Sequence, residues 1–171
     1  MTFWTNTDSN PTRQFRFMIS NGAGSWWWVS SCDKPSYEVS TEEYKLTNHK
    51  FKYPGVTTWN DVTITVVDVN KTAKGLYEAL KHGGYAPTKS DKINDGMEKS
   101  NMSEMLKSIG SEPSNAGSFQ ILQLDDEGTA IETWTLVNPF IKSTNFGSLD
   151  YSSDDLVKLE LVISYDYAEL T

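Results

Sequence analysis

The segment from residue 58 to residue 82 constrains the fold most, because two periodicities follow each other there. In "TWNDVTITVVDVN", Val62, Ile64 and Val66 alternate with Thr63, Thr65 and Val67. Period-two alternation predicts a half-buried strand. In "KTAKGLYEALKH" the apolar positions change to helical spacing, and Gly83 and Gly84 mark a stop; these positions are Ala73, Leu76, Tyr77 and Leu80. The second segment therefore predicts a helix packed over the sheet.

Strands are predicted at three further places along the chain. "RQFRFMIS", "NGAGS" and "SWWWVSSC" read as a strand, a turn and a return strand. "SFQILQLDDEGTAIETWTLVNP" reads as two strands joined by the turn 125–128. "DLVKLELVISYDYAEL" predicts a last strand over 155–167 with one wet face; this face carries Lys158, Glu160, Val162, Ser164 and Asp166.

Two long stretches do not fit into regular alternation. Residues 37–56 are rich in Tyr, Val and Thr and end near Pro54-Gly55, which is typical of a projecting hairpin or arm. Residues 83–118 form a connector in which "NMSEMLKSIG" predicts a short second helix. Its apolar stripe is Met102, Met105, Leu106 and Ile109.

These elements predict one domain over 1–171 of mainly β class: an antiparallel sandwich or barrel with one packed helix, a second short helix and a projecting hairpin. Residues 1–12 are expected to form an N-terminal arm. No stretch approaches the ~18 consecutive apolar residues of a membrane span, and no export signal is evident, so a soluble chain without a membrane anchor is expected.

Charge and cysteine content exclude some classes of partner and cofactor. The net charge is −8, and residues 111–171 hold eleven acids against Lys142 and Lys158. Such a region is unsuited to gripping a phosphate backbone. Cys32 is the one cysteine, which excludes an internal disulfide and an intrachain thiolate cluster.

The sequence offers no convergent set of catalytic or metal-binding residues. His82 ends the predicted helix, where a cation is favourable, and Glu42, Glu43 and His49 form only a loose metal-ligand set. The adjacent acids at 125–127 and 154–155 are explained by turns and solvation. We therefore expect neither enzymatic activity nor a bound cofactor or metal.

The aromatic content, with six tryptophans and eight tyrosines, is the feature that needs a functional explanation. Successive side chains of a strand point to opposite faces, so Trp27 is expected to point away from Trp26 and Trp28. Three interpretations of these tryptophan and tyrosine side chains remain open: core packing between two layers, a sugar-stacking platform, or a protein interface.

Three segments, taken in order, resemble the tail tube proteins of contractile-tailed, T4-like bacteriophages. They are the hairpin "RQFRFMISNGAGSWWWVSSCDKP", the strand and helix "TWNDVTITVVDVNKTAKGLYEAL", and the closing element "LVNPFIKSTNFGSLDYSSDDLVKLELVISYDYAEL". The connector 83–118 has no close counterpart. The resemblance implies a structural subunit whose hexameric rings stack into a virion tail tube, assembled in the host bacterial cytoplasm, that conducts double-stranded DNA into the host.

The resemblance also implies partners and suggests which residues meet them. Expected partners are further copies of the chain, a tail sheath protein, a tape-measure protein, and a baseplate hub or tail terminator; DNA would pass without sequence-specific binding. The expected subunit interface comprises Trp26, Trp27, Trp28, Tyr37, Tyr44, Phe51 and Tyr53. The expected lumen-facing set is Lys158, Glu160, Ser164 and Asp166. The alternatives are the tube of a contractile bacteriocin or injection system and, further off, a carbohydrate-binding sandwich.

Overall fold

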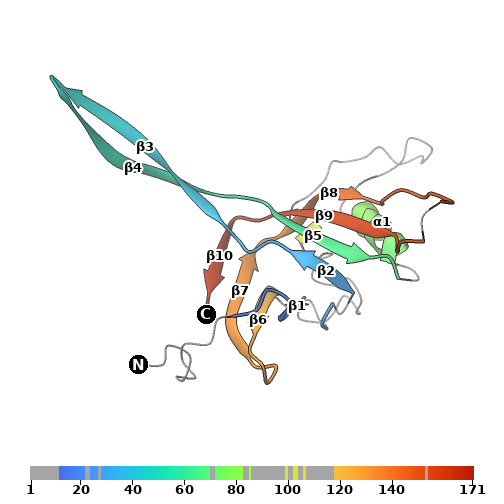
Figure 1. Ribbon diagram of the computed structural model, residues 1–171. Coiled ribbons are helices and arrows are strands. Elements are labelled where there is room, and N and C mark those ends of the chain that lie inside the picture. Colours follow the sequence, from blue (N-terminus) through green and yellow to red (C-terminus); the bar gives the residue numbers. More distant parts are fainter. Residues whose placement is uncertain are drawn as a thin grey trace.

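The chain forms two four-stranded antiparallel sheets, a long two-stranded ribbon and a helix, as the computed structural model shows (Figure 1). The structure describes residues 12–21, 24–26, 28–69, 72–82, 85, 99, 102–103, 106, 118–152 and 154–171. The mainly β class with a packed helix and a projecting hairpin is confirmed. The described strands form open sheets rather than a closed barrel.

Sheet A has the strand order β1-β6-β7-β10, and sheet B has the order β2-β5-β9-β8. The strands of sheet A are β1 (Phe17–Ser20), β6 (Phe119–Leu124), β7 (Ala130–Val137) and β10 (Tyr167–Leu170). Those of sheet B are β2 (Val29–Cys32), β5 (Val62–Val67), β9 (Lys158–Ser164) and β8 (Phe140–Asn145). The ribbon consists of β3 (Tyr37–Leu46) and β4 (His49–Trp59), and α1 spans Thr72–His82.

Alternation along the strands builds one core between the two sheets. In sheet B, β5 pairs with β9 so that Val62 lies opposite Ile163 and Ile64 opposite Leu161, and all four side chains are buried. Ile19, Phe119 and other buried residues of sheet A belong to the same apolar cluster. The two sheets therefore form a sandwich, because each covers the apolar face of the other.

The predicted turn between β6 and β7 is confirmed. The Asp125 carboxylate oxygen Oδ1 accepts hydrogen bonds from the backbone N–H groups of Glu127 (2.9 Å) and Thr129 (2.7 Å). Gly128 has a φ of 85°, a left-handed conformation that glycine adopts without steric cost. This short-range chemistry explains why the hairpin could be predicted from a few residues.

The predicted hairpin over 13–35 is wrong in its pairing. β1 pairs with β6 in sheet A, whereas β2 pairs with β5 in sheet B. Among their described residues, the two segments are joined by an isolated bridge between Ser20 and Ser25. The chain crosses from one sheet to the other after this bridge, because each strand finds a longer ladder with a partner distant in sequence.

The predicted last strand over 155–167 is divided. β9 ends at Ser164, and β10 begins at Tyr167 in the other sheet. Between them Tyr165 is buried, and the Asp166 N–H donates to the Val137 carbonyl (3.1 Å). Alternation alone could not reveal this division, since the side-chain pattern continues through the corner.

The predicted helix at 71–82 is confirmed as α1. Leu76 is buried and Ala73 packs against the core, whereas Tyr77 is exposed. The second predicted helix lies mostly outside the described residues, as do Met105, Ile109, the connector around it and residues 1–11 of the N-terminal arm. Within it, Met102, Ser103 and Leu106 are described as helical, and Leu106 is fully buried.

Two glycine substitutions should have opposite effects on stability. Gly147 has a φ of 78°, and an added Cβ would lie 2.6 Å from the Lys158 carbonyl oxygen, so Gly147→Ala should lower the free energy of unfolding. We expect a loss of about 2 kcal/mol or more. A Cβ added at Gly75 in α1 would have no atom within 4 Å, so Gly75→Ala should raise the free energy of unfolding by about 0.5–1 kcal/mol. Urea unfolding, followed by tryptophan fluorescence, measures the free energy of unfolding of both variants. Equal changes in the two variants would contradict the conformational roles given to these glycines.

Candidate assembly surfaces

The ribbon is the most prominent candidate surface, and it extends from sheet B. Its strands β3 and β4 lie in the chain between β2 and β5, which are neighbours in that sheet, and it projects far from the body (Figure 1). At its base the ring of Trp59 lies 6.1 Å from that of Tyr165 and 5.4 Å from that of Tyr37. Trp59 therefore fixes the ribbon to the core of the body.

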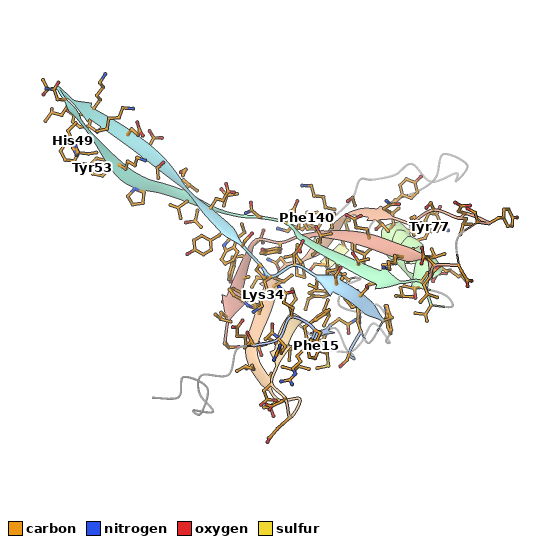
Figure 2. All side chains as sticks on the ribbon, viewed as in Figure 1. Phe15, Lys34, His49, Tyr53, Tyr77 and Phe140 are labelled. Atoms are coloured by element: carbon orange, nitrogen blue, oxygen red, sulfur yellow. The ribbon has the colours of Figure 1, made fainter. Side chains whose placement is uncertain are left out.

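The distal half of the ribbon has two chemically different faces, because residues directly opposite in the ladder lie on the same face. One face, which we call the aromatic face, carries the pairs Tyr44 with Phe51, Glu42 with Tyr53, and Leu46 with His49. The other, the basic face, carries the pairs Lys45 with Lys50, Glu43 with Lys52, and Thr41 with Pro54. The side chains of both faces are exposed in the single subunit (Figure 2).

A bulge separates this distal half from the base of the ribbon. The register shifts between Val39 and Thr41, and the Val56 N–H donates to the Ser40 hydroxyl (2.9 Å). A Cβ on Gly55 would lie only 2.3 Å from that hydroxyl oxygen, so glycine permits the close approach. Bulges bend the strand that contains them and increase its twist.

The structure divides the predicted interface residues into two groups. Tyr37, Tyr44, Phe51 and Tyr53 all lie on the ribbon with exposed side chains, from 43% for Phe51 to 60% for Tyr37. Trp27 lies outside the described residues. The remaining two, Trp26 and Trp28, belong to the body.

The position assigned to Trp26 is corrected, since it is a core residue and not a surface one. Only 4% of it is exposed, and its ring forms a T-shaped pair with that of Phe119, with the centroids 5.7 Å apart. Trp28 is half-buried, and its ring stacks on that of Trp26 with the centroids 6.1 Å apart. Both residues precede β2, which begins at Val29, so the predicted alternation of a strand does not extend to them. Of the four described tryptophans, Trp26 is buried and the other three are half-buried.

The predicted lumen-facing residues do not all share one surface. Lys158 and Glu160 are exposed and Ser164 is half-buried on the outer face of β9, opposite the buried Leu159, Leu161 and Ile163. Across the ladder, Thr65 of β5 lies opposite Glu160 and extends this polar face. Asp166 belongs to the corner between the sheets.

Asp166 is held at that corner by two side chains. The Lys99 ammonium pairs with its carboxylate, and the Asn138 amide donates to it at 2.9 Å. These contacts lower the pKa of Asp166, with the Lys99 hydrogen bond as the larger cause. The carboxylate thus ties one residue of the 83–118 connector to the corner.

The edges of sheet B are a further feature suited to assembly. Among the described strands, β2 pairs only with β5, and β8 pairs only with β9. Each edge therefore presents one side of its backbone to a partner strand.

The β8–β9 loop was not singled out from the sequence as a functional segment. We define it as residues 146–152 and 154–157. Leu149, Tyr151 and Leu156 project from it, with 89%, 111% and 70% of their surface exposed. The sequence "SLDYSSDDL" does show large apolar residues among acids and serines, which could have indicated an exposed binding loop. Turn formation and solvation of the acids explained the same pattern equally well.

Three further observations concern the chemistry of the described residues. In this part of the chain no three His, Cys, Asp or Glu side chains come close enough to hold a metal ion. No described helix is long and apolar enough to cross a membrane. Burial, with a smaller effect from Asp33, raises the pKa of the Cys32 thiol to about 12.

Comparison with known proteins yields matches only at the level of structure. No family model and no curated protein matches the chain. A chain from the sheath-tube complex of an extracellular contractile injection system (PVC) has a TM-score of 0.67 at 20% identity, covering 98% of both chains. A chain from the sheath/tube terminator of such a system has a TM-score of 0.68 at 21% identity, covering 95% of this chain and 97% of the other.

A third solved structure gives the same result. A chain from the tube-terminating cap of the anti-feeding prophage has a TM-score of 0.66 at 17% identity, covering 95% of this chain and 91% of that one. The chain has the tail tube fold. The fold expected from the sequence resemblance is thereby confirmed, whereas identities of this size carry no residue roles across.

The Cys32 thiol should be nearly inert in the folded protein. A pKa of about 12 leaves very little thiolate at pH 8, so we expect alkylation by iodoacetamide to be slower than in urea by roughly a thousandfold. Asp33→Asn should leave it slow, because burial is the larger cause of the shift. Mass spectrometry of timed samples measures the rate, and equal rates in buffer and urea would contradict this assignment.

Proposed function

We propose that this chain is the repeating subunit of a tail tube, in which hexameric rings stack along an axis. The observation that carries the proposal is the aromatic face of the ribbon, which the subunit's own body leaves uncovered. A two-stranded hairpin alone is marginally stable in water, and its exposed aromatics require a partner surface. A neighbouring copy in the adjacent ring supplies that surface in the proposed tube.

The gain from covering this face is large enough to drive assembly. An aromatic side chain buries about 150–250 Å², which corresponds to about 4–6 kcal/mol before ordering costs at ~25 cal/mol per Å². Tyr44, Phe51 and Tyr53 are between 43% and 58% exposed, so part of this amount is still available to each. The contact repeats around every ring.

Sheet B supplies the second set of contacts in the proposal. Its edge strands β2 and β8 can pair between neighbours, so that the sheets of a ring join into a continuous barrel and no edge is left bare. Its polar outer face, which carries Lys158, Glu160 and Thr65, then lines the lumen. Asp166, at the corner between the sheets, lies outside this face.

Two kinds of tube are compatible with this architecture. The first is a phage tail tube that conducts double-stranded DNA, because an acidic subunit of net charge −8 lets a polyanion slide without binding. The second is an injection-system tube without a genome, which the similarity to the injection-system chains described above favours. Neighbouring genes for capsid and packaging proteins would identify the first.

The remaining parts of the proposal concern partners and location. A sheath protein outside the tube, a baseplate hub and a terminator at its ends, and a tape-measure protein inside are the proposed partners. The assembled protein is placed in a virion or particle after assembly in the bacterial cytoplasm. The role is structural, without catalysis or a cofactor.

The purified protein should assemble, on its own or on an initiating ring, into rings and tubes of constant diameter. Negative-stain electron microscopy with rotational analysis of end-on views measures the diameter and symmetry. Six-fold rings are expected. A chain that stays monomeric at all concentrations, with and without co-expressed baseplate proteins, would overturn the proposal.

Removing the aromatic face should stop stacking without unfolding the subunit. Tyr44→Ser with Phe51→Ser takes away a cross-strand pair that is exposed in the single subunit, so the body's core stays intact. Tubes should be lost, while the urea unfolding midpoint of the body is unchanged. Ile131→Ser, at a residue 51% exposed on β7, is the control and should still form tubes. Normal tubes from the double variant would show that the ribbon is not an interface.

A further inference from the structure

We propose that the basic face of the ribbon docks on the β8–β9 loop of a second copy in the next ring. This inference rests on the proposed function, since it presupposes stacked copies. It adds a specific receptor for the ribbon, formed by acidic and apolar side chains of the same chain.

The tip of the ribbon carries an excess of positive charge. Residues 45–52 include three lysines and no acid. The Lys50 ammonium pairs with the Glu43 carboxylate at 2.9 Å, whereas Lys45 and Lys52 make no ion pair with any described residue. Two lysines on one face are therefore available to an acidic partner.

The β8–β9 loop has the complementary chemistry. Residues 146–157 contain Asp150, Asp154 and Asp155 and no lysine or arginine. The apolar side chains of Leu149, Tyr151 and Leu156 project between these acids and are highly exposed. The loop thus presents both negative charge and exposed apolar surface.

Internal hydrogen bonds hold this loop in shape. The Asp150 carboxylate oxygen Oδ1 accepts from the Ser152 N–H (2.9 Å) and hydroxyl (2.7 Å), and these bonds lower the pKa of Asp150. Asn145 Oδ1 accepts from the Gly147 N–H at 3.1 Å. A preformed loop loses less entropy on binding than a loose one.

The ribbon tip and the β8–β9 loop lie at opposite ends of the molecule (Figure 1). The tip therefore cannot meet the loop of its own copy. A contact between opposite ends of two copies is heterologous, and it leaves a free tip at one end and a free loop at the other. Such a contact repeats without limit along an axis, as growth by stacking requires.

The other exposed acidic turn of the described chain is a poorer receptor. The β6–β7 turn carries Asp125, Asp126 and Glu127, but "DDEGT" contains no large apolar side chain. Exposed ion pairs alone contribute about 0–1 kcal/mol, which is weak for a specific contact. This turn is therefore a matched control for charge without apolar surface.

Charge exchange tests the contact. Lys45→Glu with Lys52→Glu should shorten tubes by about tenfold or more, because like charges then face each other at every repeat. Asp154→Lys with Asp155→Lys should do the same, and the four substitutions together should restore long tubes. Asp126→Lys with Glu127→Lys should leave tube length unchanged. Electron microscopy gives the length distributions.

Cysteine pairs test the geometry independently of charge. Lys52→Cys combined with Asp154→Cys should give a ladder of disulfide-linked multimers when tubes are oxidised, whereas Lys52→Cys with Asp126→Cys should not. Both pairs are made in a Cys32→Ser background, so that the native thiol cannot enter this reaction.

The outcomes separate this inference from the proposed function. Wild-type protein that forms no rings would overturn the proposed function. Wild-type tubes whose length is unaffected by the lysine reversals, or a quadruple variant that fails to recover, would overturn only the docking of the basic face on the loop. Ladders of disulfide-linked multimers of equal intensity from the two cysteine pairs would also overturn the docking of the basic face on the loop.

Discussion

The antiparallel pairing of β5 with β9 is the interaction on which the rest of the structure depends. It aligns Val62, Ile64 and Val66 with Ile163, Leu161 and Leu159, and these side chains form the sheet B half of the core. Because β4 runs into β5 after only two residues, this ladder also anchors the ribbon. The packing of Trp59 on Tyr165 strengthens the connection, since Tyr165 directly follows β9. A force on the ribbon is thus transmitted to the best-buried strands of the subunit.

Local patterns predicted those elements whose cause is local. Alternation in β5, helical spacing in α1 and the Asp125–Gly128 turn each depend on residues a few positions apart, and all three are present in the structure. The exposure of the ribbon was predictable for a related reason. The stretch is too long for a simple turn and ends near Pro54-Gly55, which favoured a projecting hairpin, and its strands are exposed in the structure.

Features decided by distant partners could not be predicted in this way. The sequence predicted a strand through Trp26 and Trp28, but β2 begins at Val29, and only the contact with Phe119 of β6 shows that Trp26 lies in the core. The pairing of β1 with β6, across about one hundred residues of chain, likewise has no signature in either strand. The corner at Asp166 continues the alternation of β9, so the change of sheet is set by Val137 and Asn138 of another segment.

The uneven distribution of charge gives the proposed assembly its specificity. The ribbon, residues 37–59, contains three acids and three lysines and is neutral as a whole, so the net charge of −8 resides in the rest of the chain. Bodies of like charge repel one another at long range, which disfavours random aggregation. Within the ribbon the positive charge is concentrated near the tip, at residues 45–52. An approaching copy is then attracted chiefly where this tip meets an acidic surface, and the apolar side chains contribute binding energy once that orientation is reached.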